Sequence, residues 1–171
     1  NHLKYESKKN LKNYSIIEPK KYLFKNNKFK KSIANVYKNF NKLPKRNFDR
    51  IISCAVLEHL EDLPMFLAKT GLAMKNDGYQ SHSIPCEGYP TWKITWDIMS
   101  GIPFKLRTGL NFSEIQNHEH VNNYDEILCL IKYFYKQYDI KFSYPLFFTP
   151  YLSLYANVTF SKPKKAVIKK F

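Results

Sequence analysis

The chain alternates between apolar runs and polar turns in a pattern that predicts strands followed by helices. Residues 48–54 contain the adjacent β-branched Ile51 and Ile52, as expected of a strand that is covered on both faces. A polar turn follows, and residues 62–75 then place apolar side chains at helical spacing. Open α/β sheets bind ligands where strands end in such turns, so residues 48–62 bear most directly on function.

The same alternation continues on both sides of this stretch. Further elements are expected at residues 2–12 (the end of a helix), 14–18 (strand), 20–28 (lysine-rich helix), 32–36 and 79–84 (strands), 123–137 (helix), and 140–144 and 152–160 (strands). Strands that alternate with helices predict an α/β fold with a mostly parallel sheet and helices on both faces. The last two strands predict a closing antiparallel pair. Asn76-Asp77-Gly78 predicts a turn after the helix at 62–75.

The region between residues 85 and 117 interrupts this pattern. It is rich in turns bounded by glycine or proline, and it contains both tryptophans, Trp92 and Trp96. We therefore expect one domain over residues 1–161, with an insertion at 85–117 that lies over the carboxyl edge of the sheet. Residues 162–171 form a basic tail that we expect to fray.

The composition narrows the classes of function. The net charge is +14, but only Arg46, Arg50 and Arg107 are arginines, whereas proteins that read nucleic acids usually rely on arginine. A solvated lysine-rich surface is therefore favoured over a nucleic-acid footprint, and we expect no nucleic-acid partner. No apolar run reaches the ~20 residues that a membrane span needs, and no signal segment opens the chain. The prediction is a cytoplasmic protein without a membrane span.

The three cysteines are widely spaced and show no CxxC or Cys/His cluster of the kind that binds zinc. We expect reduced thiols, with Cys54 and Cys129 in the core. His118-Glu119-His120 has no third ligand nearby in the sequence, so no metal site is expected.

Six segments, taken in order, resemble one family of enzymes. They are YSIIEP (14–19), SIANV (32–36), FDRIISCAVLEHLED (48–62), LAMKNDGYQSHSIP (72–85), IPCEGYPTW (84–92) and NHEHVNNYDEI (117–127). Their order and spacing are similar to those of class I S-adenosylmethionine-dependent methyltransferases over nearly the whole chain. The resemblance implies a Rossmann-like sheet and S-adenosylmethionine as the cofactor. It also implies transfer of a methyl group to a small-molecule, lipid or glycan-precursor acceptor.

The resemblance assigns roles to individual residues. Glu18 ends the segment similar to the family's second strand, whose terminal acid binds the ribose hydroxyls, and Asn35 would lie near the adenine. Glu58 and His59 would lie at the mouth of the site. The cofactor-binding residues implied in this way are Glu18, Pro19, Asn35, Ser53, Cys54 and Ala55.

One part of the family pattern is missing. The family begins with a strand and a glycine-rich loop, but the first glycine of this chain is Gly71. Asn1-His2-Leu3 resembles the residues just after that loop. We therefore expect a domain that is incomplete at its N-terminus and lacks the first strand.

Methyl transfer requires the acceptor to be held in line with the methyl group, and a base can take the acceptor's proton. Histidine titrates nearest neutrality, so His59 and His120 are the candidate catalytic bases. Each has a structural alternative, since His59 could brace the following helix and His120 could brace the site. Trp92, Trp96 and His118 are candidate acceptor-binding residues, although the tryptophans could equally form a satellite core.

Three other functions stay open at this point. The charge of +14 allows a basic nucleic-acid-binding α/β domain. A nucleotide-dependent oxidoreductase would share the acid that ends a strand. An inactive methyltransferase remnant follows if the chain is complete as it stands. The methyltransferase interpretation predicts that Glu18 and residues 53–55 face one cleft.

Overall fold

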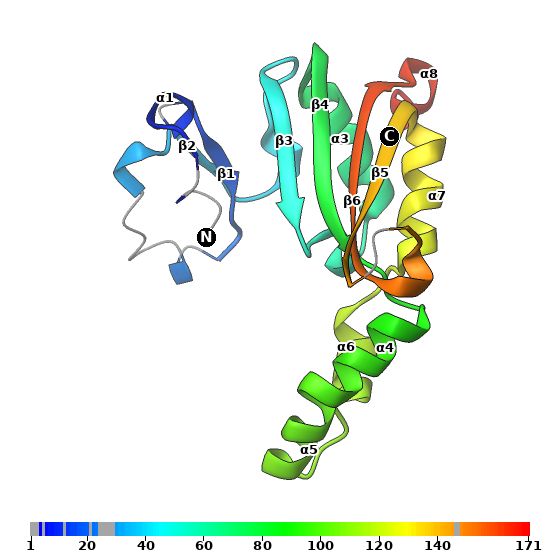
Figure 1. Cartoon of the computed structure of the whole chain (residues 1–171). Helices are drawn as coiled ribbons and strands as arrows, with labels where there is room; N and C mark the ends of the chain where they lie inside the picture. Colours follow the sequence, from blue (N-terminus) through cyan, green and yellow to red (C-terminus); the bar gives the residue numbers. More distant parts are fainter. Residues whose placement is uncertain (1–3, 5, 12, 21, 24–29, 146–147) are drawn as a thin grey trace. The chain divides into compact units, whose positions relative to one another are not determined.

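The computed structural model describes residues 4, 6–11, 13–20, 22–23, 30–145 and 148–171 (Figure 1). The chain divides into two compact units, Asn1–Pro44 and Lys45–Phe171. In the described part of the chain, no helix combines the length and the apolar character needed to cross a membrane.

The first unit contains a pair of short parallel strands. Helix α1 (Lys8–Leu11) precedes β1 (Ser15–Ile17), and β2 (Asn35–Tyr37) pairs with β1 from Ser15 opposite Asn35 onward. Two 3₁₀ turns lie at Lys30–Ser32 and Phe40–Lys42. Both expected strands are therefore present but shorter, and the second, expected at 32–36, is shifted to 35–37. Most of the helix expected at 20–28 lies outside the described residues.

The second unit is built on a four-stranded sheet with the order β3-β4-β6-β5. The strands are β3 (Phe48–Cys54), β4 (Met74–Pro85), β5 (Tyr135–Pro145) and β6 (Ser153–Pro163). β3 and β4 are parallel, and β6 runs antiparallel to both β4 and β5. β3, β4 and β5 therefore share one direction, and β5 with β6 is the expected closing antiparallel pair.

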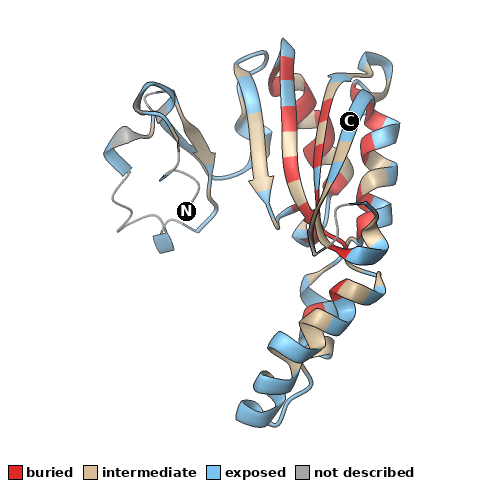
Figure 2. Cartoon of the chain, in the orientation of Figure 1, coloured by how far each residue is buried: buried red, intermediate tan, exposed pale blue. Residues whose placement is uncertain are grey.

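Three helices pack on one face of this sheet: α3 (Leu63–Ala73), α7 (Tyr124–Phe134) and α8 (Lys165–Ile168) (Figure 1). The Asp62 carboxylate caps α3 by accepting from the Met65 N–H at 3.1 Å. Asn123 and Glu126 form a capping box at the start of α7. The core lies between sheet and helices, where Figure 2 shows the buried positions of β4, β6, α3 and α7. It includes Leu63, Leu67, Ile84, Ile127, Ile131, Phe134, Val158 and Phe160.

The last ten residues pack on this core and do not fray. Ile168 is only 2% exposed, and the ring centroid of Phe171 lies 5.2 Å from that of Phe134. Lys69 Nζ also donates to the Phe171 carbonyl at 3.2 Å. The expectation of a frayed tail was wrong because it rested on the lysines of the tail. It did not take into account that Ile168 and Phe171 are apolar and lie at helical spacing.

The Asn76-Asp77-Gly78 sequence does not form the expected turn, since it lies within β4 at an irregularity in the β3–β4 register. A Cβ at Gly78 would lie 2.9 Å from the Phe48 carbonyl oxygen and 2.6 Å from Met74 Cγ. The glycine is therefore explained by the close approach of the neighbouring strand. The cysteines also differ from expectation, because Cys54 and Cys129 are exposed and Cys86 is buried.

Helices fill the expected insertion. They are α4 (Pro90–Trp96), a π-helical turn (Asp97–Gly101), α5 (Ile102–Thr108) and α6 (Phe112–Glu119). We call residues 90–119 the helical arm, which extends beyond the carboxyl ends of β3 and β4 (Figure 1). Its own small core is aromatic: Trp92 stacks on Trp96 with ring centroids 5.3 Å apart, and Phe112 contacts Trp96 and Phe104.

A polar network runs through the core of the second unit. Ser53 Oγ lies 2.6 Å from His82 Nδ1, and His82 Nε2 lies 3.2 Å from Gln80 Oε1. Gln80 Nε2 donates to the Tyr135 hydroxyl at 2.6 Å and to Thr70 Oγ1 at 3.1 Å. Since the amide oxygen of Gln80 faces His82, the network assigns the imidazole proton to Nε2 and leaves Nδ1 to accept from Ser53. His82 is neutral in this tautomer, and its burial favours that state.

Acidification should therefore destabilise the protein through His82. Burial lowers the pKa of His82 from 6.5 to about 3, so the unfolded chain binds a proton in this pH range and the folded chain does not. As the pH is lowered from 6.5 to about 3, the free energy of unfolding should therefore decrease, by up to ~1.4 kcal/mol per pH unit. His82→Asn keeps a hydrogen-bonding side chain that does not titrate. In urea denaturation, its stability deficit relative to the wild type should shrink as the pH falls, and a constant deficit would contradict this account.

Candidate functional site

The chain leaves the sheet after β3 through a strained turn. Ala55 has a φ of 50°, in the left-handed region that costs a residue with a side chain ~1–2 kcal/mol. Its N–H donates to the Ser83 carbonyl of β4 at 3.0 Å. Leu57–His59 then form a 3₁₀ turn, with Leu57 and Glu58 buried. The side chains of this turn therefore lie at the carboxyl edge that β3 and β4 share.

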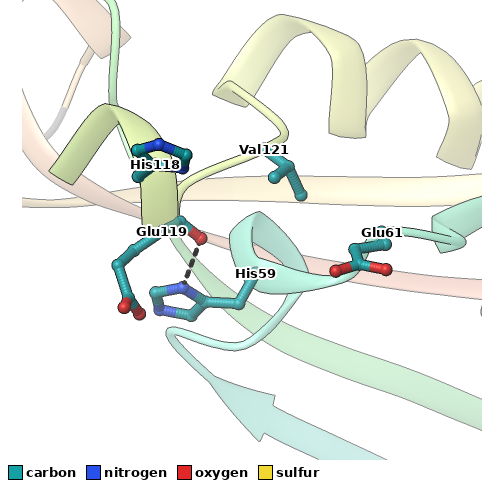
Figure 3. Close-up of a pocket in the computed structure, with 5 residues that line it drawn as sticks. All are labelled: His59, Glu61, His118, Glu119 and Val121. Carbon is teal, nitrogen blue, oxygen red and sulfur yellow. Dashed lines mark hydrogen bonds between the residues drawn. The ribbon is translucent and has the colours of Figure 1, made fainter. Parts of the chain in front are cut away.

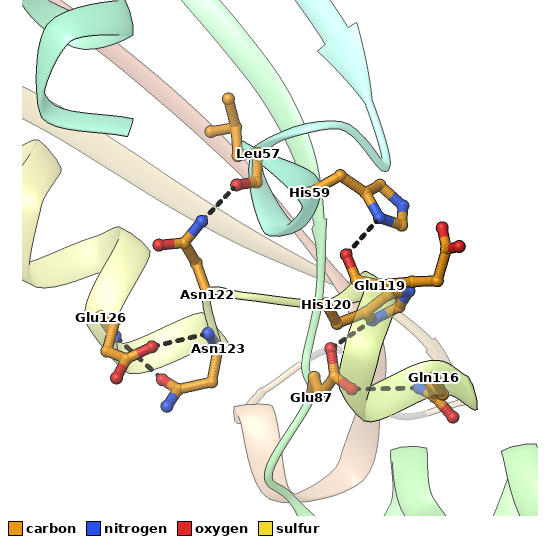
Figure 4. Close-up of polar contacts among 9 residues, drawn as sticks. All are labelled: Leu57, His59, Glu87, Gln116, Glu119, His120, Asn122, Asn123 and Glu126. Atoms are coloured by element: carbon orange, nitrogen blue, oxygen red, sulfur yellow. Dashed lines mark hydrogen bonds and ion pairs between the residues drawn. The ribbon is translucent and has the colours of Figure 1, made fainter. Parts of the chain in front are cut away.

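The segment after the helical arm is bonded directly to this turn. The N–H groups of Val121 and Asn122 both donate to the Glu58 carbonyl, at 2.9 and 3.1 Å. Asn122 Nδ2 also donates to the carbonyls of Leu57, at 3.1 Å, and Leu60, at 2.7 Å (Figure 4 draws the first). The Leu-Glu-His turn and the Glu-His-Val-Asn segment are thus two parts of one site, although about sixty residues separate them.

This junction brings the two candidate bases together. The ring centroids of His59 and His120 lie 4.6 Å apart, with the ring planes perpendicular. His59 Nδ1 lies 2.9 Å from the Glu119 carbonyl (Figure 3). A carbonyl oxygen only accepts, so Nδ1 of His59 carries a proton and, in the neutral ring, Nε2 is the basic nitrogen.

His120 is paired with a carboxylate. Its Nδ1 lies 2.6 Å from Glu87 Oε2, and both side chains are largely buried, at 14% and 16% exposure. Gln116 Nε2 donates a hydrogen bond to the other carboxylate oxygen of Glu87, Oε1, at 3.0 Å (Figure 4). An imidazole that donates Nδ1–H to a carboxylate presents Nε2 as an acceptor, and its protonated form is stabilised by that carboxylate.

Glu58 contributes a second buried acid. It is 1% exposed, and its Oε2 atom has no hydrogen-bond partner among the described residues. Burial raises the pKa of Glu58; Glu87 adds to the shift, whereas a backbone hydrogen bond at Glu58 and the nearby His59 and His120 oppose it. The pKa of Tyr155 is also raised, by burial and by the proximity of Cys54 and Glu58. The site therefore combines two acids, two imidazoles and a phenol.

An open pocket of about 360 Å³ adjoins this cluster (Figure 3). Its lining residues are His59, Glu61, His118, Glu119 and Val121. The exposed His118 thus shares a pocket with His59, as expected if both face the same ligand. In the described part of the chain, no group of three histidine, cysteine or acidic side chains is placed to hold a metal ion.

The remaining predicted residues are placed as follows. Ser53 belongs to the core network and Cys54 is exposed at the end of β3. Trp92 is 6% exposed, and Trp96 Nε1 is buried with no hydrogen-bond partner among the described residues, so both lie within the aromatic core of the arm.

In the first unit, Glu18 follows β1 and its Oε1 accepts from the Lys20 N–H at 2.8 Å, with Pro19 between them. Asn35 begins β2 opposite Ser15, with Nδ2 at 3.4 Å from Ser15 Oγ. Because the two strands are parallel, Glu18 lies at their carboxyl end and Asn35 at their amino end.

Sequence reasoning assigned no role to several residues of this site: Glu87, Gln116, Asn122 and Tyr155. Glu87 lies in IPCEGYPTW and Asn122 in NHEHVNNYDEI, two of the six segments that carry the family resemblance. Membership of these segments was the available signal, but it did not indicate which residues are in contact.

The fold is similar to those of S-adenosylmethionine-dependent methyltransferases. No family model matches the chain, and no curated protein matches it by sequence. Among solved structures, a methyltransferase of Thermotoga maritima, described as a possible histamine N-methyltransferase, superposes with a TM-score of 0.59 at 12% identity. The match covers 90% of this chain and 74% of that one.

A methyltransferase of Archaeoglobus fulgidus gives a TM-score of 0.53 at 16% identity, over 86% of this chain and 74% of that one. A protein of Pyrococcus horikoshii gives 0.56 at 11% identity, over 88% and 71%. The Rossmann-like methyltransferase fold expected from the sequence is therefore confirmed.

The Asn122 amide should be a main support of the site. Asn122→Ala removes two hydrogen bonds to turn carbonyls, so we expect the free energy of unfolding to fall by about 1–3 kcal/mol. Asn117→Ala, at an exposed position of α6, should change it by less than about 0.5 kcal/mol. Urea denaturation of the two variants measures the difference, and equal losses would argue against the amide as a support.

Proposed function

We propose that the chain belongs to an enzyme that transfers a methyl group from S-adenosylmethionine to a small-molecule, lipid or glycan-precursor acceptor. The proposal is carried by the position of the histidine–carboxylate cluster at the carboxyl edge of β3 and β4, on a methyltransferase fold. Ligands of parallel α/β sheets bind at this edge. The cluster also supplies the proton acceptors that such a transfer needs.

The residues at this edge suit a cofactor that bears hydrogen-bond donors. Glu58 Oε2 is a buried acceptor with no partner among the described residues, and buried polar atoms are normally satisfied. Ala55 turns the chain away from the sheet and leaves Cys54 exposed at the strand end. We assign Ser53, Cys54 and Ala55 to the border of the cofactor. Glu18, with Pro19, remains our candidate for the ribose hydroxyls. Asn35, predicted to lie near the adenine, stands at the opposite, amino end of the strand pair, and we do not assign it to the cofactor.

When bound, S-adenosylmethionine supplies an activated methyl group on a positively charged sulfur, which departs as a neutral thioether. The role of the protein is to orient the acceptor and to take up its proton. Nε2 of His120 is the proposed proton acceptor, and the Glu87 carboxylate stabilises the resulting imidazolium. His59 is the second candidate, since the Glu119 carbonyl also holds its Nδ1–H.

The acceptor would occupy the pocket lined by His59 and His118, and would reach His120 past the His59 ring, whose centroid lies 4.6 Å from that of His120. Trp92 lies behind His120, with ring centroids 6.4 Å apart, and Trp96 stacks on Trp92. We infer that the tryptophans fix the position of the His120 ring and close one side of the acceptor site. Lining by two histidines and two acids favours a polar acceptor group such as a hydroxyl or an amine.

Calorimetric titration of S-adenosylhomocysteine tests the choice of cofactor. We expect binding by the full chain, and Glu18→Ala should weaken it at least about tenfold through the loss of charge-assisted hydrogen bonds. Asp139→Ala, which removes an acid that is 67% exposed on β5, is the matched control and should leave the affinity unchanged. A folded chain that releases no heat up to about 1 mM ligand would overturn the proposal.

Turnover with an acceptor tests the proposed base. His120→Asn should lower kcat by about 10²–10⁴-fold, the usual contribution of a general base. Glu87→Gln should lower kcat about tenfold, as expected for a residue that supports the base. Both variants should keep the KM for S-adenosylmethionine, and Glu114→Gln, an exposed acid of α6, is the control. Full kcat in His120→Asn would exclude His120 as the base.

A further inference from the structure

The helical arm carries a row of large apolar side chains on its outside. Each of these residues is between 54% and 83% exposed, in contrast to the buried core of the sheet. Figure 2 shows the arm exposed along most of its length. The residues are Ile94, Ile98, Met99, Ile102, Leu106 and Leu110.

All of these residues except Leu110, which follows the helix, lie on one continuous helix. Helical conformation runs from α4 through the π-helical turn into α5, until Gly109 ends it with a φ of 75°. Ile94, Ile98, Ile102 and Leu106 are spaced four residues apart, and residues at that spacing share a helix face. Along a regular α-helix, residues four positions apart rotate gradually around the helix axis, because one turn holds about 3.6 residues. A π turn holds more residues per turn, so it reduces this rotation and keeps the side chains on one face.

The opposite face of the same helix already has its partners. Trp92 stacks on Trp96, and Trp96 and Phe104 each pack against Phe112 of α6. The outer apolar face is therefore not needed to hold the arm together. Exposed apolar patches of this kind mark interaction surfaces, and the arm extends beyond the edge of the sheet where a flat partner can reach it (Figure 1).

The charges near the tip indicate the chemistry of that partner. Residues 98–113 contain Lys105 and Arg107 and no acidic residue, in a chain of net charge +14. Both basic side chains lie on exposed positions of α5, beside Leu106, which is 83% exposed. A second copy of the chain would bring the same sign of charge to this surface, whereas an anionic surface complements it.

We propose that the outer face of the helical arm docks on an anionic lipid bilayer. A basic helix with one aliphatic face lies in the plane of a membrane interface, with its apolar residues in the acyl boundary. Lys105 and Arg107 then contact lipid phosphates, and their aliphatic stems cover the apolar row. The proposal concerns attachment and holds whether or not the chain transfers methyl groups.

Vesicle co-sedimentation of the full chain tests this proposal. We expect binding to vesicles of phosphatidylcholine with phosphatidylglycerol, and at least about tenfold weaker binding to phosphatidylcholine alone. Leu106→Asp should weaken binding to the anionic vesicles at least about tenfold. Tyr138→Asp, which places the same charge at a half-exposed position of β5, should leave binding within about twofold. Circular dichroism checks that each variant is folded.

A second comparison of variants distinguishes vesicle binding through the helical arm from binding through the overall positive charge of the chain. Lys105→Ala with Arg107→Ala should weaken binding more than Lys136→Ala with Lys141→Ala on β5, although both pairs remove two charges. Equal losses in the two pairs, or equal binding to both kinds of vesicle, would overturn the proposal. So would a dimer in vesicle-free solution that Leu106→Asp dissociates, because the apolar row would then join two copies of the chain.

Discussion

The candidate site depends on one junction, in which the Glu58 carbonyl accepts the N–H groups of both Val121 and Asn122. This junction ties the turn after β3 to the segment that ends the helical arm. Without it, His59 and His120 would belong to independent loops. With it, their rings are held 4.6 Å apart at the edge where ligands of such sheets bind.

The same junction explains the chemical character of the site. It buries Glu58 in a place where no described residue satisfies Oε2, and it brings His120 to within 2.6 Å of Glu87. Since the arm begins just after β4 and ends at this junction, both of its ends are fixed to the carboxyl edge of the sheet. Trp92, in the aromatic core of the arm, then packs near the His120 ring. The outer aliphatic face of the arm is left available for another partner.

Much of the fold could be predicted from the sequence because strong local patterns specify it. The bounds of β3 were predicted correctly, and the capped helices were predicted to within a few residues. The pairing of Glu87 with His120 was not predictable, since the two are 33 positions apart and the whole helical arm separates them. Gly78 was read as a turn because sequence alone does not show that the backbone of a neighbouring strand lies close by. The core network through His82 was missed for a similar reason, since its members come from β3, β4, β5 and α3.

The most direct test of the central claim is an NMR titration of the labelled histidine side chains with S-adenosylhomocysteine. If the junction forms the methyltransferase site, the ring signals of His59 and His120 should shift together on saturation. His82, buried in the core at 1% exposure, should respond far less. Unchanged signals of His59 and His120 in a folded protein that binds the ligand would place the site elsewhere and contradict the account.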